Sequence, residues 1–507
     1  MSDASDRRTF RTFLFGGGRQ MLSLLPSLIV YPIIARDLGD HQFGAWTLIG
    51  AAGFMLILSD AGLSTAVRRA AVTDDHGLAR RTMGLALLTI TTLLPIGIGL
   101  LLYFMLDFTE VNASLRAEAR TAAMVMMVGG SLGALANPFM DFVYARGGSA
   151  QVARARILGS SAQIALLLGG FFLWRKSILV PAAASTISSG IQLTMLARAA
   201  RGHDPELPLL PQWPRDRPEA LRSFGDGIAQ LAINAAVVMA LRIDYAVLEW
   251  AAAKHALRDG LSAREASEKA LTLVGKYGLA GLAVDMSYSV AKQANTAIMR
   301  SLGRRDERAS AFRIGTLLFS GVIVSGMSAI AFAGQPFIAM ILGEKARGLE
   351  VFTTLHLLGA AAMLLSTYEV AGAMVMLSAR SAWACATPYI VGALVNLALS
   401  VTFAPLAPLH GMVAVAGSTI VGNLVACVLM WRQVTKLLEW GRKEVLSVFV
   451  PVAASAVVAS VAGFVLAPHD LAHPVASLFI CIVVTLSGLA TLTLFTRNTW
   501  KAQGIAP

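Results

Sequence analysis

Apolar stretches of roughly 18 to 25 residues recur along nearly the whole chain, and short polar segments separate them. A helix needs about 20 apolar residues to cross a hydrocarbon layer about 30 Å thick. The pattern therefore predicts an all-α polytopic membrane protein with about 14 transmembrane helices. The predicted helices are 13–34, 43–67, 82–106, 121–143, 157–174, 178–196, 225–248, 272–298, 312–333, 351–377, 384–403, 412–431, 445–466 and 475–495.

A proline-rich polar segment divides these helices into two groups, because proline cannot continue a helix. The two groups predict parallel repeats, and similar tetrapeptides open them, Phe-Gly-Gly-Gly at 15–18 and Phe-Gly-Asp-Gly at 224–227. The expected domains are an N-terminal six-helix lobe over 1–196, a cytoplasmic linker over 197–222, a C-terminal six-helix lobe over 223–432 and two additional transmembrane helices over 433–507.

The distribution of charge predicts the orientation of the helices. The net charge is +12, but the basic residues lie in short loops between apolar segments, which argues against a nucleic-acid partner. Lys and Arg concentrate in alternate loops, and loops of this kind stay on the cytoplasmic side. We therefore expect cytoplasmic N- and C-termini and an outward-facing loop over 249–271. That loop contains Ser262 and Glu265, whose spacing predicts a helix cap.

The sequence shows no signature of a soluble enzyme. A phosphate-binding loop of the G-x-x-x-x-G-K-[ST] type and a zinc-binding H-E-x-x-H pair are both absent. Cys385, Cys427 and Cys481 all fall in apolar stretches and are interpreted as packing residues. We expect no enzymatic activity, no cofactor and no metal site.

Charged residues inside the predicted helices are the candidates for function, because a charge at bilayer depth is costly and normally faces a cavity or a partner. Asp141, Asp226 and Lys276 lie near helix ends, where capping or snorkelling explains them. The candidate cations are Arg19, Arg242 and Lys292. The candidate carboxylates are Asp60, Asp244, Asp285 and Glu369.

The candidates differ in the alternatives that they leave open. Arg19 and Asp60 lie at similar depth in neighbouring helices, so they could form a structural ion pair instead of a binding site. Arg242 and Asp244 are two residues apart and do not face each other on a helix, so each needs its own partner. Arg242 could also snorkel to the outer interface or pair with Asp285.

The first helical hairpin carries a family resemblance. It contains Pro-Ile-Ile-Ala-Arg-Asp-Leu-Gly at 32–39, Phe-Gly-Ala-Trp at 43–46 and Asp-Ala-Gly-Leu at 60–63, followed by Arg68 and Arg69. This hairpin resembles that of the polysaccharide transporter family, the oligosaccharide-lipid flippases of the multidrug, oligosaccharidyl-lipid and polysaccharide exporter superfamily. Ile243-Asp244, near the outer end of the predicted helix 225–248, looks like a recurrent feature of the same family, although the loop after it is longer than usual.

The resemblance implies a flippase of a bacterial cytoplasmic membrane. Its cargo would be a polyprenyl-diphosphate-linked oligosaccharide for cell-surface polysaccharide biosynthesis, such as lipopolysaccharide or exopolysaccharide, carried by alternating access. A polysaccharide polymerase and glycosyltransferases would be partners. A diphosphate in a low-dielectric cavity needs fixed cations, for which Arg19, Arg242 and Lys292 are the candidates.

Two other functions fit the sequence less closely. A cation-coupled multidrug antiporter of the same superfamily would use a buried carboxylate such as Asp60, Asp244 or Asp285 for ion exchange. A membrane-embedded glycan polymerase or ligase would be expected to carry a large catalytic outer loop, and the predicted outer loops are short.

Overall fold

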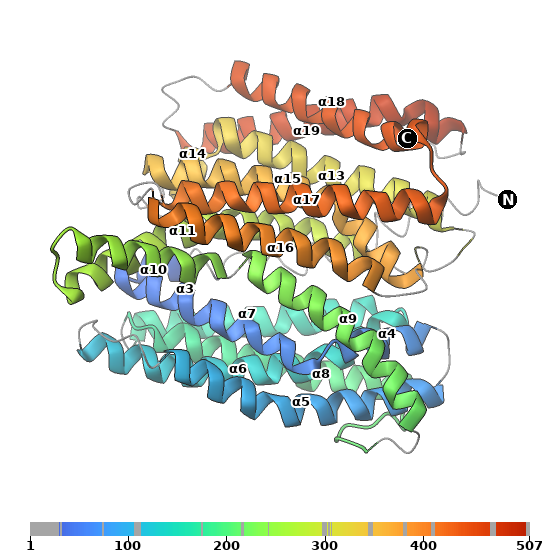
Figure 1. Ribbon diagram of the computed structural model, residues 1–507, viewed down its shortest axis with the longest axis horizontal. Helices are drawn as coiled ribbons and strands as arrows, with labels where there is room; N and C mark the ends of the chain where they lie inside the picture. The colour runs from blue at the N-terminus through green and yellow to red at the C-terminus, as the bar shows by residue number, and fades with distance from the viewer. Residues whose placement is uncertain are drawn as a thin grey trace. The chain divides into compact units, whose positions relative to one another are not determined.

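The computed structural model describes residues 30, 33–72, 76–105, 113–173, 176–213, 217–241, 243–296, 302, 305, 307–342, 348–378, 383–406, 411–466 and 473–502. Within these ranges, ten helices are long and apolar enough to cross a membrane. The predicted all-α polytopic fold is therefore confirmed (Figure 1).

Ten of the predicted helices correspond directly to these spans. The first predicted helix, 13–34, lies almost wholly outside the described residues. The predictions at 225–248 and 272–298 fall on α9–α10 and on α11, which are described below. The prediction of one continuous helix over 43–67 is wrong, because the structure breaks it near its middle.

The helices divide into two compact units by their contacts. The first unit contains the described residues up to Gly278 together with Leu397–Gly411. Its helices are α3 (Asp40–Met55), the 3-10 helix η2 (Leu56–Asp60), α4 (Leu63–Val72), α5 (His76–Met105), α6 (Ala113–Ala145), α7 (Ser149–Leu173), α8 (Leu179–His203), α9 (Arg217–Leu241), α10 (Ile243–Arg258), the start of α11 (Ala263–Thr296) and η4 (Ala404–Leu406).

The second unit contains Leu279–Asn396 and the described residues from Met412 onward. Besides the end of α11, its helices are α13 (Arg308–Ala333), α14 (Gln335–Leu342), α15 (Leu349–Ser378), α16 (Trp383–Phe403, which ends in the first unit), α17 (Gly411–Leu438), α18 (Arg442–Leu466) and α19 (Pro474–Ala502).

The core of the first unit lies where α4, α5, α6, α7 and α8 meet. Leu63 and Val67 on α4 pack there with Met83 on α5 and Phe142 on α6, and all four are fully buried. Fully buried apolar side chains between helices give this unit a packed interior of its own, as in a soluble domain.

A seam of small residues joins α18 and α19 to α13 in the second unit. The hydroxyls of Ser325 on α13 and Ser455 on α18 lie 2.9 Å apart, and Ser455 donates a hydrogen bond of 2.8 Å to the carbonyl of Gly488 on α19. A Cβ at Gly488 would lie only 2.3 Å from Ser325 Oγ. Small residues with shared hydrogen bonds hold membrane helices together where lipid offers no hydrophobic drive. The last two helices are thus integral to the second unit.

The polar stretch after α8 is held against α5. α8 continues to His203, beyond the predicted start of the linker at residue 197. Arg80 on α5 then binds the buried Asp204 through two hydrogen bonds of 2.7 and 2.8 Å. Farther along, the Gln212 amide donates to the Gly84 carbonyl at 3.2 Å. Part of the segment between α8 and α9 is therefore docked on a transmembrane helix.

The predicted cap at the start of α11 is present. The Glu265 amide donates to Ser262 Oγ at 3.3 Å, and the Ser262 amide donates to Glu265 Oε2 at 2.9 Å. The Ser262 hydroxyl and amide hold the pKa of Glu265 below its usual value. This reciprocal pair begins α11 at Ala263, directly after the short turn that follows α10.

Candidate functional site

The break in the second predicted helix surrounds Asp60. α3 ends at Met55, a 3-10 turn runs to Asp60, and α4 begins at Leu63. Between them, Ala61 and Gly62 have φ angles of 48° and 73°, in the left-handed region that favours glycine. Interrupted backbone at membrane depth needs internal partners for its polar groups.

Asp60 provides such a partner. Its carboxylate is buried and accepts a 2.7 Å hydrogen bond from the Gly62 amide, two residues ahead. An Asp that bonds the backbone two residues on is typical of a turn and satisfies an amide that has no helical acceptor. One of the predicted carboxylates is therefore already used in shaping the backbone.

The same turn lies directly against α9. A Cβ at Gly62 would lie 2.2 Å from the Gly227 carbonyl, and one at Gly227 would lie 2.7 Å from the Ala61 carbonyl. Gly227 belongs to the tetrapeptide that suggested an internal repeat, whereas Gly225 in that tetrapeptide has open space around it. The glycines at 62 and 227 thus allow two backbones to touch at the broken helix.

An ion pair lies farther along α4. Arg68 contacts Asp141 on α6, and the carboxylate of Asp141 is almost fully buried while a quarter of the Arg68 side chain is exposed. The sequence interpretation explained Asp141 by its nearness to a helix end. The structure shows a specific partner instead, and that partner belongs to the hairpin that carries the family resemblance.

Asp244 is held near the start of α10. Its exposed fraction is 2%, and the Tyr277 hydroxyl on α11 donates to Asp244 Oδ2 at 3.1 Å. The rings of Tyr245 and Tyr277 pack edge to face, with their centroids 5.4 Å apart. The carboxylate is therefore fixed by an aromatic hydroxyl inside the first unit.

Glu369 belongs to a polar network inside the second unit. It lies half-buried on α15 and shares a hydrogen bond with Tyr389 on α16. The neighbouring Tyr368 donates to Asn423 Oδ1 on α17 at 3.0 Å, and its ring lies 5.6 Å from that of Tyr389. Asn423 in turn donates to the Ala361 carbonyl at 3.0 Å. Tyr368, Tyr389 and Asn423 were missed because uncharged polar residues do not stand out in an apolar sequence.

For the four other predicted candidates, the structure gives a position, a helix without the side chain, or nothing. Asp285 lies half-buried on α11, in its part within the second unit. Lys292 lies on the same helix, but its side chain is outside the described residues, as are Arg19 and Arg242. Their proposed roles in binding stay predictions.

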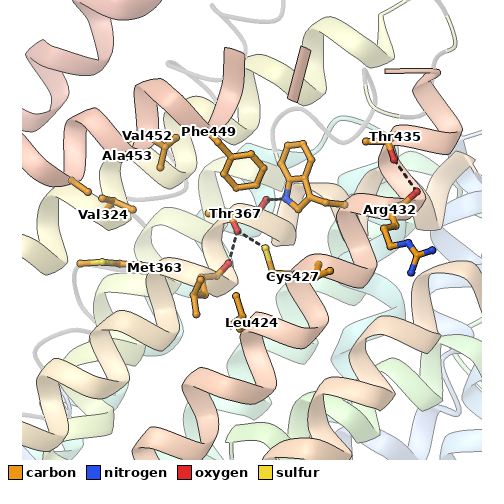
Figure 2. A pocket seen from close by; sticks show the side chains of 14 residues that line it. Val324, Met363, Thr367, Leu424, Cys427, Arg432, Thr435, Phe449, Val452 and Ala453 are labelled. Atoms are coloured by element: carbon orange, nitrogen blue, oxygen red, sulfur yellow. Dashed lines mark hydrogen bonds between the residues drawn. The ribbon is translucent and has the colours of Figure 1, made fainter. Parts of the chain in front are cut away.

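A cavity of about 590 Å³ opens beside this polar network, between α13, α15, α17 and α18 (Figure 2). Its wall is almost wholly apolar, and Arg432 and Thr435 lie at one end. Trp431 on the wall donates its indole N–H to the Thr367 carbonyl at 3.0 Å. Charge patterns in the sequence gave no signal for this cavity, because its wall is mostly apolar and is formed by packing among four helices.

The cysteines agree with their interpretation as packing residues. Cys385, Cys427 and Cys481 are buried and free of disulfides. Each lies within hydrogen-bonding distance of a neighbouring helix, as in the 3.2 Å contact between Cys427 and Thr367. In the part of the chain that the structure describes, no group of three or more His, Cys, Asp and Glu side chains could hold a metal ion.

The fold is similar to those of solved membrane transporters. A variant of the MATE transporter VcmN from Vibrio cholerae has a TM-score of 0.61 and 13% identity, and the match covers 88% of this chain and 99% of that one. The chain shares the fold of this transporter. An outward-facing multidrug resistance MATE transporter of the MOP superfamily matches with a TM-score of 0.59 and 16% identity, over 85% of this chain and 96% of that one.

The lipid II flippase MurJ, in an inward closed conformation, has a similar fold. It matches with a TM-score of 0.60 and 11% identity, over 97% of this chain and 99% of its own. No protein-family model and no curated protein matches the chain by its sequence. At these identities the likeness concerns the fold, and it confirms the fold that the first hairpin suggested.

Proposed function

We propose that this protein is a flippase that moves a polyprenyl-diphosphate-linked oligosaccharide across a bacterial cytoplasmic membrane by alternating access. It acts as a multi-pass transporter without enzymatic activity. The two lobes proposed from the sequence, 1–196 and 223–432, move about a central cavity, with both termini in the cytoplasm. The glycan is used in cell-surface polysaccharide biosynthesis, in which glycosyltransferases and a polymerase are the expected partners.

The extent of the match to the flippase MurJ carries this proposal. That match covers 97% of the chain, whereas the two MATE transporters cover 88% and 85% of it. The additional helices α18 and α19 pack on α13 through buried serines and glycine, so they are part of the working fold. A chain with two integral helices beyond two six-helix lobes fits a flippase better than a twelve-helix antiporter.

The charges within the helices support the same cargo. A diphosphate that enters a cavity of low dielectric must exchange water for fixed positive groups, and arginine binds phosphate oxygens through two parallel hydrogen bonds. Arg19, Arg242 and Lys292 are proposed for this role. Asp60 is already bonded to the Gly62 amide, which leaves it less suited to carry a coupling ion.

A cation-coupled multidrug antiporter is the second candidate. Asp244 favours it, because this carboxylate is buried and held by an aromatic hydroxyl, an arrangement that can accept and release a proton or a cation. The similar TM-scores of the MATE transporters give it comparable support from the fold.

Reconstitution into liposomes separates the two candidates. The purified protein would be supplied with a fluorescent polyprenyl-diphosphate-linked oligosaccharide, and transfer between leaflets would be measured by protection from a reagent that cannot cross the membrane. A flippase increases the protected fraction above that of protein-free liposomes. Ethidium uptake driven by a proton or sodium gradient, with no glycan transfer, would instead identify the antiporter.

Substitution of Arg242 tests the binding role within this assay. We expect Arg242→Gln to abolish glycan transfer and Arg242→Lys to retain part of it, because lysine keeps the charge and loses the paired hydrogen bonds. Arg258→Gln, at the exposed end of α10, is the matched control and should leave transfer unchanged. Full transfer by Arg242→Gln at normal membrane abundance would remove Arg242 from the binding site.

A further inference from the structure

The apolar cavity between α13, α15, α17 and α18 has no role in the transport proposed above. Its wall is formed by Val324, Met363, Leu424, Phe449 and Val452 with their neighbours, which come from four helices of the second unit. Leu424 is half exposed, so this apolar space reaches the surface of the unit. An apolar space of this kind does not hold ordered water, which needs several polar partners, and within a membrane it suits hydrocarbon.

The polar groups of the wall already have partners. The Trp431 indole donates to the Thr367 carbonyl, and the Thr367 hydroxyl donates to the Leu364 carbonyl at 2.7 Å. The Thr435 hydroxyl donates to the Arg432 carbonyl at 3.0 Å. The interior therefore suits an alkyl chain and offers nothing for a sugar or another polar ligand to bind.

Arg432 gives one end of the cavity a positive charge, and more basic residues follow it in the sequence. Arg432 lies at its edge with an exposed side chain, and Lys436 follows one turn later on α17. α18 begins nearby in the sequence with Arg442 and Lys443. Glu439 and Glu444 are the acidic residues of the same stretch, so the cations outnumber them by four to two over residues 432–444. The expected orientation places this end at the cytoplasmic surface.

We propose that the cavity binds one acyl chain of an anionic phospholipid of the cytoplasmic leaflet, with the lipid phosphate on the guanidinium of Arg432. An apolar slot between transmembrane helices with basic residues at its cytoplasmic end matches the two parts of such a lipid. Arginine suits phosphate because its planar fork donates two parallel hydrogen bonds. The lipid fills the space between α17 and α18 and so couples the added helices to the rest of the second unit.

Binding of defined lipids to the purified full-length protein tests this proposal. The protein would be delipidated in a neutral detergent, and the occupancy by phosphatidylglycerol and by phosphatidylcholine with the same acyl chains would be measured by native mass spectrometry. We expect phosphatidylglycerol to bind, and Arg432→Gln to weaken that binding about fivefold, the effect of one basic residue near an anionic lipid. Arg432→Lys should weaken it less.

Two control variants and one further test variant show whether an effect on lipid binding is specific to this cavity, and not a general result of lost positive charge or added side-chain bulk. Arg201→Gln removes an exposed arginine in the last turn of α8, which does not line this cavity, and should not change binding. Ala453→Phe fills the cavity from α18 and should weaken binding as Arg432→Gln does. Val457→Phe adds similar bulk at an exposed position of the same helix outside the cavity wall and should have no effect.

The proposal is overturned if Arg432→Gln and Ala453→Phe bind phosphatidylglycerol as the unaltered protein does. It is also overturned if phosphatidylcholine binds equally well, if polyprenyl phosphate displaces the phospholipid from the site, or if another part of the chain fills the cavity and no lipid binds. Should Ala453→Phe fail to fold, Arg432→Gln decides alone, since its side chain is exposed. Transport is not measured, so failure of the flippase proposal would leave this result standing.

Discussion

Asp60 is the last residue of η2, and its carboxylate accepts a hydrogen bond from the Gly62 amide in the turn before α4. From the sequence it was a candidate for ion coupling or for a pair with Arg19. Its observed bond is to the backbone, where it satisfies an amide that the broken helix leaves without a helical acceptor. A charged residue at membrane depth can thus have a structural role, here the stabilisation of a break between two helices.

Substitutions at Asp60 distinguish a structural role, the hydrogen bond with the Gly62 amide, from a role in ion coupling. Asn keeps an oxygen that can accept the Gly62 amide, so Asp60→Asn should fold and transport nearly as the unaltered protein does, whereas Asp60→Ala should lose about 1–3 kcal/mol of stability. Thermal unfolding in detergent and glycan transfer in liposomes measure the two effects. A stable Asp60→Asn protein without transport would assign the carboxylate to coupling instead.

Asp204, outside the membrane spans, is also a buried carboxylate that stabilises the local structure through hydrogen bonds. The hydrogen bond from Arg80 is the main cause that holds the pKa of Asp204 below its usual value, and burial opposes it. A carboxyl whose folded pKa is lowered stabilises the protein above its ordinary pKa of about 4, and this stability is lost as the pH falls toward the folded pKa.

We therefore expect Asp204→Asn to lower stability by about 1–2 kcal/mol at pH 7, because Asp204 is buried while Arg80 is a third exposed. The difference from the unaltered protein should shrink as the pH is lowered below about 4. Melting temperatures across this range provide the measurement. Glu206→Gln is the control, since the Glu206 side chain is 74% exposed and its pair with Arg80 should contribute little. A difference that stays constant with pH would contradict the role of the charge.

At the scale of elements, hydropathy located most helices but not the break near Asp60. Residues 43–67 are mostly apolar, so the pattern predicts a single helix there. The break is stabilised by contacts that the local pattern does not contain, above all the approach of Gly62 to the Gly227 carbonyl on α9. Gly62 itself was a visible signal, because glycine is the residue that adopts positive φ without strain.

The seam between α13, α18 and α19 gives a prediction at the same scale. Gly488→Ala would place a Cβ 2.3 Å from Ser325 Oγ and 3.1 Å from the Ala459 Cβ, so the helices must separate. Overpacking of this kind costs about 1–3 kcal/mol, and we expect a lower melting temperature and less protein in the membrane. Gly326→Ala on α13 is the control, because a Cβ there meets nothing within 4 Å. Equal stability of the two variants would show that the seam tolerates separation.

At the scale of the whole molecule, the distribution of Lys and Arg predicts which side each loop faces. Both termini should be cytoplasmic, and residues 249–271, which include the short turn between α10 and α11, should face outward. Fusions of a periplasm-active and a cytoplasm-active reporter, placed at the C-terminus and in residues 259–262, would measure this. A C-terminal reporter that is active only outside the cytoplasm would exclude the model of about fourteen helices.

The sequence by itself determined that the protein is all-α and polytopic, where most of its helices lie, and that α11 begins with a Ser262–Glu265 cap. These properties are local, because the hydrocarbon layer requires each segment to be long and apolar and a cap involves residues three apart. The resemblance at the first hairpin also implied a transporter fold, and the chain shares its fold with solved membrane transporters.

Only the tertiary structure decided how the polar groups are satisfied. Asp141 pairs with Arg68 and Asp244 with Tyr277, and the network at Glu369 and the cavity at Arg432 each draw on several helices. These contacts join residues separated by tens of positions in the chain. A hydropathy pattern shows how deep a charge lies but not which neighbour faces it, because packing between distant helices sets that choice.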